Sequence, residues 1–445
     1  MNWEQLLSLK RFGDTKPRLR KDQDETRLGF EVDYDRIVFS NPFRSLQDKT
    51  QVVPLSKTDF VHTRLTHSLE VSVVARSLGR AVGKALLDKY PILKEQDYKV
   101  NDFGAIVASA ALAHDIGNPP FGHAGEKAIG DYFASGNGKQ YKAYLSDKEW
   151  QDLIDFEGNA NGFKILTESY EGKAGGIRLS YATLGAFMKY PKESLPKKPT
   201  RHVADKKYGV FQSELSFFKE LAADLGLDYQ DEKILKYHRH PLAFLVEAAD
   251  DICYTIIDFE DGINLGLVEE EYALEYLINL VRDSIDIKKY YALPNKSSRL
   301  SYLRALSIGA LIDEATKQFL DNESAILKGD FDKALLDKCK YEAQINDIIK
   351  ISIAKIYKSK EVLEKEISGY RVIADLLDCF SDAAIHKLLK TETNYDALLL
   401  QLVPDPFKEK ITTHYQTLIS ICGFVASMSD SQALLLHKKI KGFLV

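Results

Sequence analysis

A histidine and an aspartate stand side by side at the end of an apolar stretch, in the sequence Ala-Leu-Ala-His114-Asp115-Ile-Gly. Adjacent imidazole and carboxylate groups at the rim of a buried helix can give a metal ion one nitrogen and one oxygen ligand, and the carboxylate can bridge to a second ion. The dipeptide alone decides little, because a histidine at a helix end is often a simple hydrogen-bonding group. A metal site therefore requires further ligands elsewhere in the chain.

Two other segments supply such ligands. His67 follows an Arg-Leu-Thr sequence, and Asp250 follows Glu-Ala-Ala inside an apolar stretch. Buried carboxylates are costly unless they are paired or bound to a metal, which favours a functional role for the second segment. The set holds two imidazoles and two carboxylates: His67, His114, Asp115 and Asp250. Without thiolates it is unlike a structural zinc site, and it suits Mg, Mn, Fe, Co, Ni or Zn.

Another histidine, His123, follows His114 after nine residues, across the irregular sequence Gly-Asn-Pro-Pro-Phe-Gly. We expect this loop to end the helix and to fold back. Glu126 lies one helical turn after His123, where its carboxylate can bond the ring, set its tautomer and raise its pKa. Such an imidazole suits a general acid. Without a nearby metal, the same histidine is equally well explained as a helix cap.

Four ordered motifs resemble the dGTPase family of deoxynucleoside triphosphate triphosphohydrolases, within the HD superfamily of metal-dependent phosphohydrolases. They are Arg-Leu-Thr-His67-Ser-Leu-Glu-Val, His114-Asp115-Ile-Gly-Asn-Pro-Pro-Phe-Gly-His123-Ala-Gly-Glu126, Phe156-Glu-Gly-Asn159-Ala and Glu247-Ala-Ala-Asp250-Asp251-Ile-Cys-Tyr254. The resemblance runs from about Asn41 to Asn264. Matching the superfamily pattern makes Asp250 the ligand and leaves Asp251 either to support the ligands from behind or to pack the helix, since neighbours on a helix point about 100° apart.

The resemblance implies hydrolysis of a dNTP to a deoxynucleoside and inorganic triphosphate, assisted by a divalent metal, with Mg or Mn expected. A metal-bound hydroxide would attack the α-phosphorus, with Asp115 among the ligands. His123, oriented by Glu126, would protonate the departing 5′ oxygen. Some members of the family prefer dGTP and others accept all four dNTPs, so the base is left open.

The resemblance also assigns the sugar contacts. Asp250, Tyr254 and Asp258 are spaced four residues apart and therefore share one helix face. In the family, the matching tyrosine packs where a 2′-hydroxyl would clash, and the matching aspartate bonds the 3′-hydroxyl. Residues that match Gln51 and Val52 touch the sugar as well.

A triphosphate carries about four negative charges and needs several cations. The family places an arginine and lysines where this chain has Arg64, Lys189 and Lys207, with Tyr190 beside the first lysine. The stretch 189–207 has seven Lys or Arg residues, two acids and three prolines, which predicts a loop or lid. Its composition alone fits a solvated surface loop, and the resemblance favours phosphate binding.

Helical periodicity dominates the chain and predicts an all-α fold, an HD-domain helical core with additional C-terminal helices and at most a small β-hairpin. The metal ligands are expected on helices at 67–87, 103–114 and 241–259. Further helices are predicted at 213–225, 269–284, 299–324, 329–340, 342–358, 360–380, 383–388, 394–401 and 406–425. The best strand signal is Val52-Val-Pro-Leu55.

Three parts are expected along the chain: an N-terminal segment at 1–40, an HD-domain catalytic core at 41–265, and a helical region at 266–445 that completes the core and makes oligomer contacts. The mixed composition of 134–150 is typical of an insertion within the core. Family members commonly form hexamers, so we expect a homo-oligomer. Arg371 is a weaker candidate that would reach a neighbouring subunit's site.

The composition describes an ordinary globular protein: 445 residues, 45% hydrophobic and 28% charged, with a net charge of −5. That charge disfavours a surface dedicated to coating nucleic acid, although some family members bind single-stranded DNA or a dNTP effector. Four scattered cysteines favour a reduced, cytoplasmic setting. We expect no secretion signal and no membrane span, because no apolar run reaches about 18 residues.

Two other functions compete with this interpretation. One is a different HD phosphohydrolase, such as a 5′-nucleotidase or a cyclic-nucleotide phosphodiesterase. The pair His123 and Glu126, and the helix face that carries Tyr254 and Asp258, disfavour this alternative. The other is a catalytically silent nucleotide- or DNA-binding regulator, which the complete ligand set disfavours.

Overall fold

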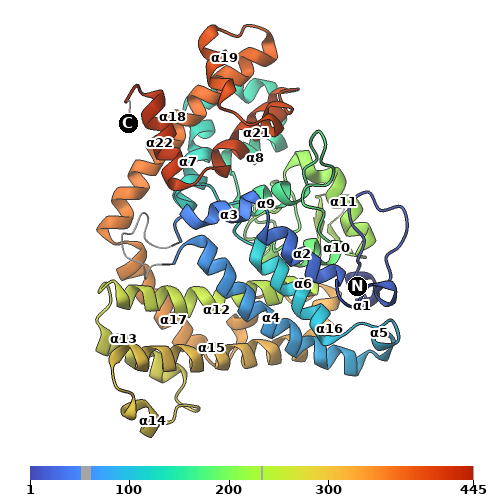
Figure 1. Cartoon of the computed structure of the whole chain (residues 1–445), viewed down its shortest axis with the longest axis vertical. Coiled ribbons are helices and arrows are strands. Elements are labelled where there is room, and N and C mark those ends of the chain that lie inside the picture. The colour runs from blue at the N-terminus through green and yellow to red at the C-terminus, as the bar shows by residue number, and fades with distance from the viewer. Residues whose placement is uncertain (52–61, 232–233, 444–445) are drawn as a thin grey trace.

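The computed structural model describes residues 1–51, 62–231 and 234–443, and helices make up most of them (Figure 1). The named strands of this part are β1 (Tyr229–Asp231) and β2 (Lys236–Tyr237), which pair antiparallel. The all-α prediction with at most a small hairpin is confirmed. The strand predicted at Val52-Val-Pro-Leu55 lies outside the described residues.

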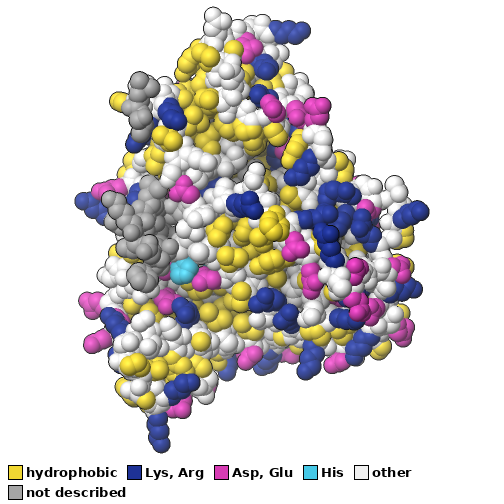
Figure 2. All heavy atoms as spheres, viewed as in Figure 1, with side chains coloured by type: hydrophobic (Ala, Val, Ile, Leu, Met, Phe, Trp, Pro, Cys, Tyr) yellow, Lys and Arg dark blue, Asp and Glu magenta, His cyan; other side chains and the backbone are white. Residues whose placement is uncertain are grey.

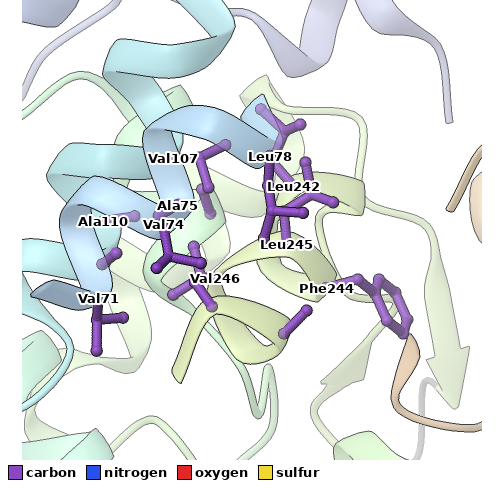
Figure 3. Close-up of a cluster of buried hydrophobic side chains, with 14 of the residues drawn as sticks. Val71, Val74, Ala75, Leu78, Val107, Ala110, Leu242, Phe244, Leu245 and Val246 are labelled. Atoms are coloured by element: carbon purple, nitrogen blue, oxygen red, sulfur yellow. The ribbon is translucent and has the colours of Figure 1, made fainter. Parts of the chain in front are cut away.

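Three helices that carry the predicted metal ligands pack around one hydrophobic core. They are α4 (Arg64–Lys89), α6 (Val100–Ala113) and α12 (Pro241–Asn264), with α15 (Lys296–Asp321) packed against α4 and α12. Figure 3 shows their side chains meeting: Val71, Val74 and Leu78 from α4, Val107 from α6, and Leu242, Leu245 and Val246 from α12. Burial of these apolar groups fixes the helices to one another, and with them the ligands they carry.

Two glycines let α4 and α6 approach closely. A Cβ at Gly79 would lie 2.6 Å from the carbonyl oxygen of Phe103, and a Cβ at Gly83 would lie 2.7 Å from the Phe103 side chain. Any larger residue would push the two helices apart. The two glycines thus set how closely α4, which carries His67, packs against α6, which ends at His114.

A second hydrophobic core lies in the upper part of Figure 1. It is built from α7 (Gly122–Ala134), α8 (Asp147–Ile154), α18 (Lys360–Leu389), α19 (Asn394–Gln401), α21 (His414–Ser427) and α22 (Asp430–Ile440). Residues of the C-terminal half therefore pack directly on α7, which carries His123 and Glu126. The helices that carry the predicted metal ligands pack in the first core, whereas the helix that carries the predicted acid packs in the second.

The other helical elements complete the chain between these units. They are α1 (Trp3–Leu6), η1 (Arg20–Asp22), α2 (Gly29–Val38), α3 (Asn41–Arg44), η2 (Ser45–Asp48), α5 (Pro91–Glu95), η3 (Asn137–Tyr144), α9 (Gly158–Thr167), α10 (Tyr181–Phe187), η4 (Val203–Asp205), η5 (Gln212–Glu214), α11 (Leu215–Asp224), α13 (Glu270–Leu280), α14 (Ile287–Ala292), α16 (Glu323–Lys328), η6 (Leu335–Lys338), α17 (Glu342–Ile351) and η7 (Ser352–Tyr357). The last of these is a π-helical turn.

The helix predictions differ from the structure at three places. The break predicted between 380 and 383 is wrong, because α18 runs unbroken through Ser381, which is fully buried in the second core. The helix predicted at 406–425 is interrupted, and Thr413 starts α21 by accepting a hydrogen bond from the Gln416 backbone. The helix predicted at 329–340 is reduced to η6, since Gly329 ends α16 in the left-handed conformation (φ 78°).

Among the described residues, no single helix is both long and apolar enough to cross a membrane. The helix pair His414–Ser427 and Asp430–Ile440 meets the length and composition criteria only together, and it is bent by 113°.

Candidate active site

The four predicted metal ligands converge at one point between α4, α6 and α12. The His67 Nε2 atom lies 3.2 Å from Asp250 Oδ1, and the His114 Nε2 atom lies 3.4 Å from the same oxygen. Asp115 Oδ1 is 3.5 Å from His114 Nε2. Ligand atoms of His67, His114 and Asp115 all lie within 4.8 Å of one another, close enough to share an ion.

Local hydrogen bonds orient these ligands. His114 caps the end of α6, and its Nδ1 donates to the carbonyl of Ala111 at 2.6 Å, which leaves the Nε2 lone pair facing the cluster. His67 sits in the first turn of α4, which a capping box at Thr63 starts. The carboxylate of Asp250 reaches the cluster from α12, whereas Asp251 lines only an adjoining cavity, which shares Asp250 and Tyr254 with the cavity around the cluster.

Two cations neutralise the carboxylates of the cluster. Arg64 Nη1 lies 2.6 Å from Asp115 Oδ2, and Lys189 Nζ lies 2.6 Å from Asp250 Oδ2. Burial alone would raise the pKa of both aspartates, but Arg64 and His114 hold the pKa of Asp115 below its usual range. Lys189 and His114 lower the pKa of Asp250 in the same way. Both groups are therefore carboxylates at neutral pH, as metal ligands must be.

The basic loop folds into the protein rather than standing in solvent. Lys189 and Lys192 are buried, and Lys207 Nζ pairs with Glu157 Oε1 at 2.8 Å. Burial disfavours the charged lysine, but Glu126 and Glu157 outweigh it and raise the pKa of Lys207. Tyr190 lies under the guanidinium of Arg239, 5.6 Å from the ring centre. Lys189, Tyr190 and Lys207 all line the same cavity as the four predicted metal ligands.

His123 and Glu126 form a pair at the start of α7. His123 Nδ1 lies 2.6 Å from Glu126 Oε2, and Glu126 Oε1 accepts a hydrogen bond from the Gly158 backbone at 2.8 Å. The His123 side chain is 74% exposed, so its other ring nitrogen is accessible to a ligand. Burial alone would raise the pKa of Glu126, but the bond to His123 and the charge of Lys207 bring it below its ordinary value.

The turn that presents His123 requires an unusual backbone. Phe121 and Gly122 both adopt left-handed conformations, with φ of 63° and 57°. A Cβ at Gly122 would also lie 2.8 Å from the Arg64 guanidinium. Glycine is therefore needed here both for its conformation and for the space it leaves to Arg64.

Residues from the far end of the chain hold this turn in place. The Asp430 carboxylate, at the start of α22, accepts hydrogen bonds from the backbone of Phe121 at 2.9 Å and from the backbone of Thr50 at 3.2 Å. Lys49, which is buried, donates to the carbonyls of Asn118 and Ala426, each at 2.7 Å. These contacts link the C-terminal helices to both sides of the cavity.

A wall of aromatic and acidic groups lines the other side of the cavity. Tyr254 and Asp258 project from one face of α12, and Tyr357 joins them from η7. The rings of Tyr254 and Tyr357 are parallel, with centres 5.5 Å apart, and the Tyr357 hydroxyl donates to Asp258 Oδ2 at 2.7 Å. Burial raises the pKa of Asp258 to about 7.

Four residues that line the cavity have a buried polar atom without a described hydrogen-bond partner, and the atoms are Asp258 Oδ1, Gln51 Oε1, Arg64 Nε and His67 Nδ1. Such atoms are costly unless a ligand satisfies them. Val52, predicted beside Gln51, lies outside the described residues.

The cavity has a volume of about 540 Å³ and brings together all the described residues predicted for the site except Glu126, which lies behind His123. It is lined by Thr50, Gln51, Arg64, His67, His114, Asp115, Asn118, Phe121, Gly122, His123, Asn159, Lys189, Tyr190, Lys207, Asp250, Tyr254, Asp258, Tyr357, Val362 and Glu366. Arg371 is not among them; it is exposed and pairs with Asp375 at 3.2 Å.

Several lining residues were not predicted. Asn159 lies inside one of the four motifs, whereas Tyr357, Val362 and Glu366 belong to segments without any motif. Nothing in the local sequence marks Tyr357, which lies 99 residues from the Asp258 that it contacts. Several histidines without a predicted role have structural ones: His62 pairs with Asp261 at 2.8 Å, His202 caps η4 and His240 caps α12.

Comparison with known proteins gives a consistent result. A family model described as HD domain matches residues 64–157. A "deoxyguanosinetriphosphate triphosphohydrolase-like protein" of Synechocystis is 40% identical over 99% of both chains, and one of Pseudomonas aeruginosa is 38% identical over the same share. A "deoxyguanosinetriphosphate triphosphohydrolase" of Yersinia pestis is 32% identical over 82% of this chain and 79% of its own. The chain belongs to the dGTPase family of the HD-domain superfamily.

Proposed function

We propose that this protein hydrolyses deoxynucleoside triphosphates, dGTP among them, to the deoxynucleoside and inorganic triphosphate, and so controls dNTP pools. The observation that carries the proposal is the convergence of His67, His114 and Asp250 within 3.2–3.4 Å, in one cavity with the exposed imidazole of His123. Metal-assisted phosphoryl hydrolysis requires a set of metal-ligating side chains and a separate proton donor in one polar cavity.

The cluster fits a divalent cation by the chemistry of its donors. His67, His114, Asp115 and Asp250 offer two neutral imidazole nitrogens and two carboxylates, the set expected for Mg or Mn and compatible with Fe, Co, Ni or Zn. The ion would neutralise charge on the α-phosphate and activate the attacking water. Asp115 acts in catalysis only through this coordination.

His123 is the proposed general acid. Its Nδ1 is bonded to Glu126, which in turn is fixed by the Gly158 backbone, so the opposite ring nitrogen can deliver a proton to the 5′ oxygen that leaves. Arg64, Lys189 and Lys207 are the proposed triphosphate contacts, with Tyr190 beside them. Their existing carboxylate partners hold them in position before the substrate enters.

The sugar is proposed to bind against Tyr254, Asp258, Gln51 and Val52. The orphaned Asp258 Oδ1 and Gln51 Oε1 support this assignment, because each can accept a hydrogen bond from the 3′-hydroxyl. Tyr357 adds a second aromatic ring to this wall and keeps Asp258 oriented. A 2′-hydroxyl packed against two rings would lack a partner, which favours deoxyribonucleotides.

Glu366 is the proposed determinant of the base. It lies on α18 at the edge of the cavity, half-buried, and has no ion-pair partner within the described part of the chain. Guanine presents two adjacent N–H donors, and a carboxylate accepts both. We therefore expect Glu366→Gln to lower the preference for dGTP over dATP by about tenfold to a hundredfold, or 1–3 kcal/mol. Equal discrimination before and after the change would contradict this assignment.

We also infer that the protein is a homo-oligomer, with a hexamer favoured. Leu363 and Ile367 on α18 and Leu398 on α19 are exposed apolar side chains in the C-terminal half that support such contacts. A dNTP effector and single-stranded DNA are further proposed partners. Light scattering of the full chain measures the oligomer, and a monomer at all concentrations would contradict it.

Product analysis tests the reaction. Each dNTP is incubated with the full chain and Mg or Mn, singly and in pairs, and the products are separated. Deoxynucleoside and inorganic triphosphate are expected, and activity that appears only with a second dNTP would reveal an effector. Deoxynucleoside monophosphate and pyrophosphate would instead place the protein among other HD phosphohydrolases. Unchanged turnover of His123→Ala would show that another group is the acid.

A further inference from the structure

A guanidinium group lies buried where the basic loop (189–207) meets the helix that carries Asp250. Figure 2 shows Lys and Arg side chains spread over the surface of the molecule, with acidic side chains among them. Arg239 differs, because only 2% of it is exposed. It follows β2 and directly precedes His240, the N-cap of α12. A buried charge is costly unless it is paired and hydrogen-bonded, so the partners of Arg239 indicate its role.

The guanidinium of Arg239 joins the basic loop to α12. Its Nε donates a hydrogen bond to the backbone carbonyl of Lys189, and its Nη1 and Nη2 donate to the two carboxylate oxygens of Glu247 at 2.6 and 3.1 Å. Glu247 precedes Asp250 by three residues, about one turn of α12. Burial alone would raise the pKa of Glu247, but the charge of Arg239 holds it below its ordinary value. One side chain therefore fixes the loop backbone relative to the helix of a proposed metal ligand.

Backbone hydrogen bonds hold the same two segments together. The Tyr237 backbone, at the end of β2, donates to the carbonyl of Pro191 at 2.9 Å. Arg239 extends this attachment to Lys189, whose carbonyl accepts from the guanidinium instead of from the backbone. The start of the basic loop is thus held from the side of β2 at two successive points.

Two aromatic rings pack against the guanidinium. Its central carbon lies 5.6 Å from the centre of the Tyr190 ring and 5.1 Å from the centre of the Phe244 ring. Arginine suits this place because its planar group stacks on rings while its edge presents several N–H donors. A lysine would keep the charge but would lack the Nε–H donor and the planar face. The arrangement therefore depends on the guanidinium and not on its charge alone.

Arg239 does not itself reach the place where the substrate is proposed to bind. Among the described residues that line the catalytic cavity and the adjoining one, Lys189 belongs to both cavities and Arg239 to neither. The Lys189 ammonium lies 2.6 Å from Asp250 Oδ2 and so faces the proposed metal ligands. Because the lysine stem is flexible, the position of its ammonium depends on where the backbone is held. We expect an effect of Arg239 on the substrate to pass through Lys189.

We propose that Arg239 is a positioning residue, which holds the backbone of Lys189 so that its ammonium meets the triphosphate of the substrate. The inference rests on the proposed function, in which Lys189 is a triphosphate contact. Glu247 anchors the guanidinium on α12, so the place of Lys189 relative to Asp250 is set before the substrate enters. A preset position favours binding, because ordering a flexible side chain at the moment of binding costs free energy.

Steady-state release of inorganic triphosphate from dGTP by the full chain, with Mn²⁺ present, tests the proposal. Arg239→Lys should raise KM about tenfold and keep kcat within about threefold, because the triphosphate contact exists both before and during the reaction. In the Lys189→Met background, where the contact is already lost, the same change should add less than about twofold to KM. An unchanged KM in Arg239→Lys, or equal rises in both backgrounds, would overturn the proposal.

Arg11→Lys is the matched control, because Arg11 is also a buried arginine. It pairs with Asp33 at 2.6 Å and donates to the backbone carbonyl of Gly29 at 2.7 Å, and it is not among the residues that line the catalytic or the adjoining cavity. The variant should lose stability in urea and keep the KM of the wild-type protein. A comparable rise of KM in Arg11→Lys would mean that loosening any buried arginine suffices, which would also overturn the proposal.

Glu247→Gln is the second variant, for the case in which Arg239→Lys does not fold. It keeps the shape of the side chain but removes the charge that anchors the guanidinium on α12, so KM should rise about threefold. A wild-type KM in this variant would contradict the proposal. A wild-type chain that releases no triphosphate from dGTP would instead refute the proposed function. Calorimetric titration with dGTP then makes the same comparisons as Kd values, so the two failures are distinguishable.

Discussion

Asp430→Asn should slow catalysis although Asp430 belongs to the last helix of the chain. The carboxylate is buried and accepts hydrogen bonds from the backbones of Phe121 and Thr50 and from the Thr50 hydroxyl. Phe121 precedes the turn that presents His123, and Thr50 precedes Gln51. One carboxylate therefore positions both the proposed acid and a proposed sugar contact.

The size of the effect follows from the number of donors. An asparagine has the same shape but only one acceptor oxygen, so its amide can serve Phe121 or Thr50, not both. One buried backbone N–H is left unpaired, at a cost of about 1–3 kcal/mol in the free energy of unfolding. When the unpaired group is Phe121, the turn shifts, and a displacement of His123 of about 1 Å can cost on the order of a hundredfold in rate. We expect kcat to fall at least tenfold.

Asp48→Asn is the matched control. Asp48 also binds the start of α22, accepting from the Ser429 hydroxyl at 2.6 Å and from the Ser431 backbone at 3.3 Å. It is exposed and has no described hydrogen bond to the His123 turn. Its replacement should cost less than about 1 kcal/mol in stability and leave kcat within about twofold.

The assay is release of inorganic triphosphate from dGTP at saturating substrate, with unfolding in urea measured in parallel. Wild-type kcat in Asp430→Asn, together with a loss of stability, would refute the reasoning, because the contact would then be structural only. An equal loss of kcat in Asp48→Asn would refute it too, since any weakening of the α22 interface would then suffice.

Three further outcomes are expected. His123→Asn should lower kcat by about 10²–10⁴-fold with little change in metal content, and a variant that also lost its metal would contradict the separate roles of acid and ligands. Tyr357→Phe removes a hydrogen-bond donor from Asp258, so the pKa of that carboxyl should rise further above its present value of about 7. The KM for dGTP should therefore increase at neutral pH and recover above pH about 8. A KM that does not depend on pH would argue against this role of Tyr357. His240 is buried with its pKa lowered to about 4, mainly by burial. The unfolded chain binds a proton there between pH of about 6.5 and 4, so stability is lost as pH falls through that window, by up to about 3 kcal/mol; unfolding of His240→Asn should lack this part of the pH dependence.

The helical core was predictable because its pattern is local. The apolar stretch before His114 and the four-residue spacing of Asp250, Tyr254 and Asp258 reveal buried helices and a shared face without any knowledge of tertiary contacts. The break predicted between 380 and 383 is wrong, because Ser381 is buried among helices that lie far from it in the sequence and the helix continues through it. Predictions of helix boundaries are wrong where tertiary packing, rather than local sequence, determines where a helix ends.

The candidate site was predictable only as far as its motifs reach. His67, His114 and His123 lie in short segments whose residue types are typical of metal ligands and general acids. Tyr357 and Glu366 do not, because an aromatic or acidic residue in a helical segment is ordinary until the fold brings it to the cavity. Their positions depend on contacts over about a hundred residues or more, which no local spacing encodes.

The division of the described chain into two hydrophobic cores has a consequence for how the enzyme is made. The proposed metal ligands His67 and Asp250 lie on helices of the first core, whereas His123 lies in the first turn of α7, which packs against α18 in the second. Cores that are packed separately can open separately, with different free energies. We therefore expect a chain still emerging from the ribosome to form the helices that carry the proposed metal ligands before α18 to α22 exist, and to position the proposed acid only when synthesis ends. Late completion of this kind would delay destruction of dNTPs until the whole molecule is folded.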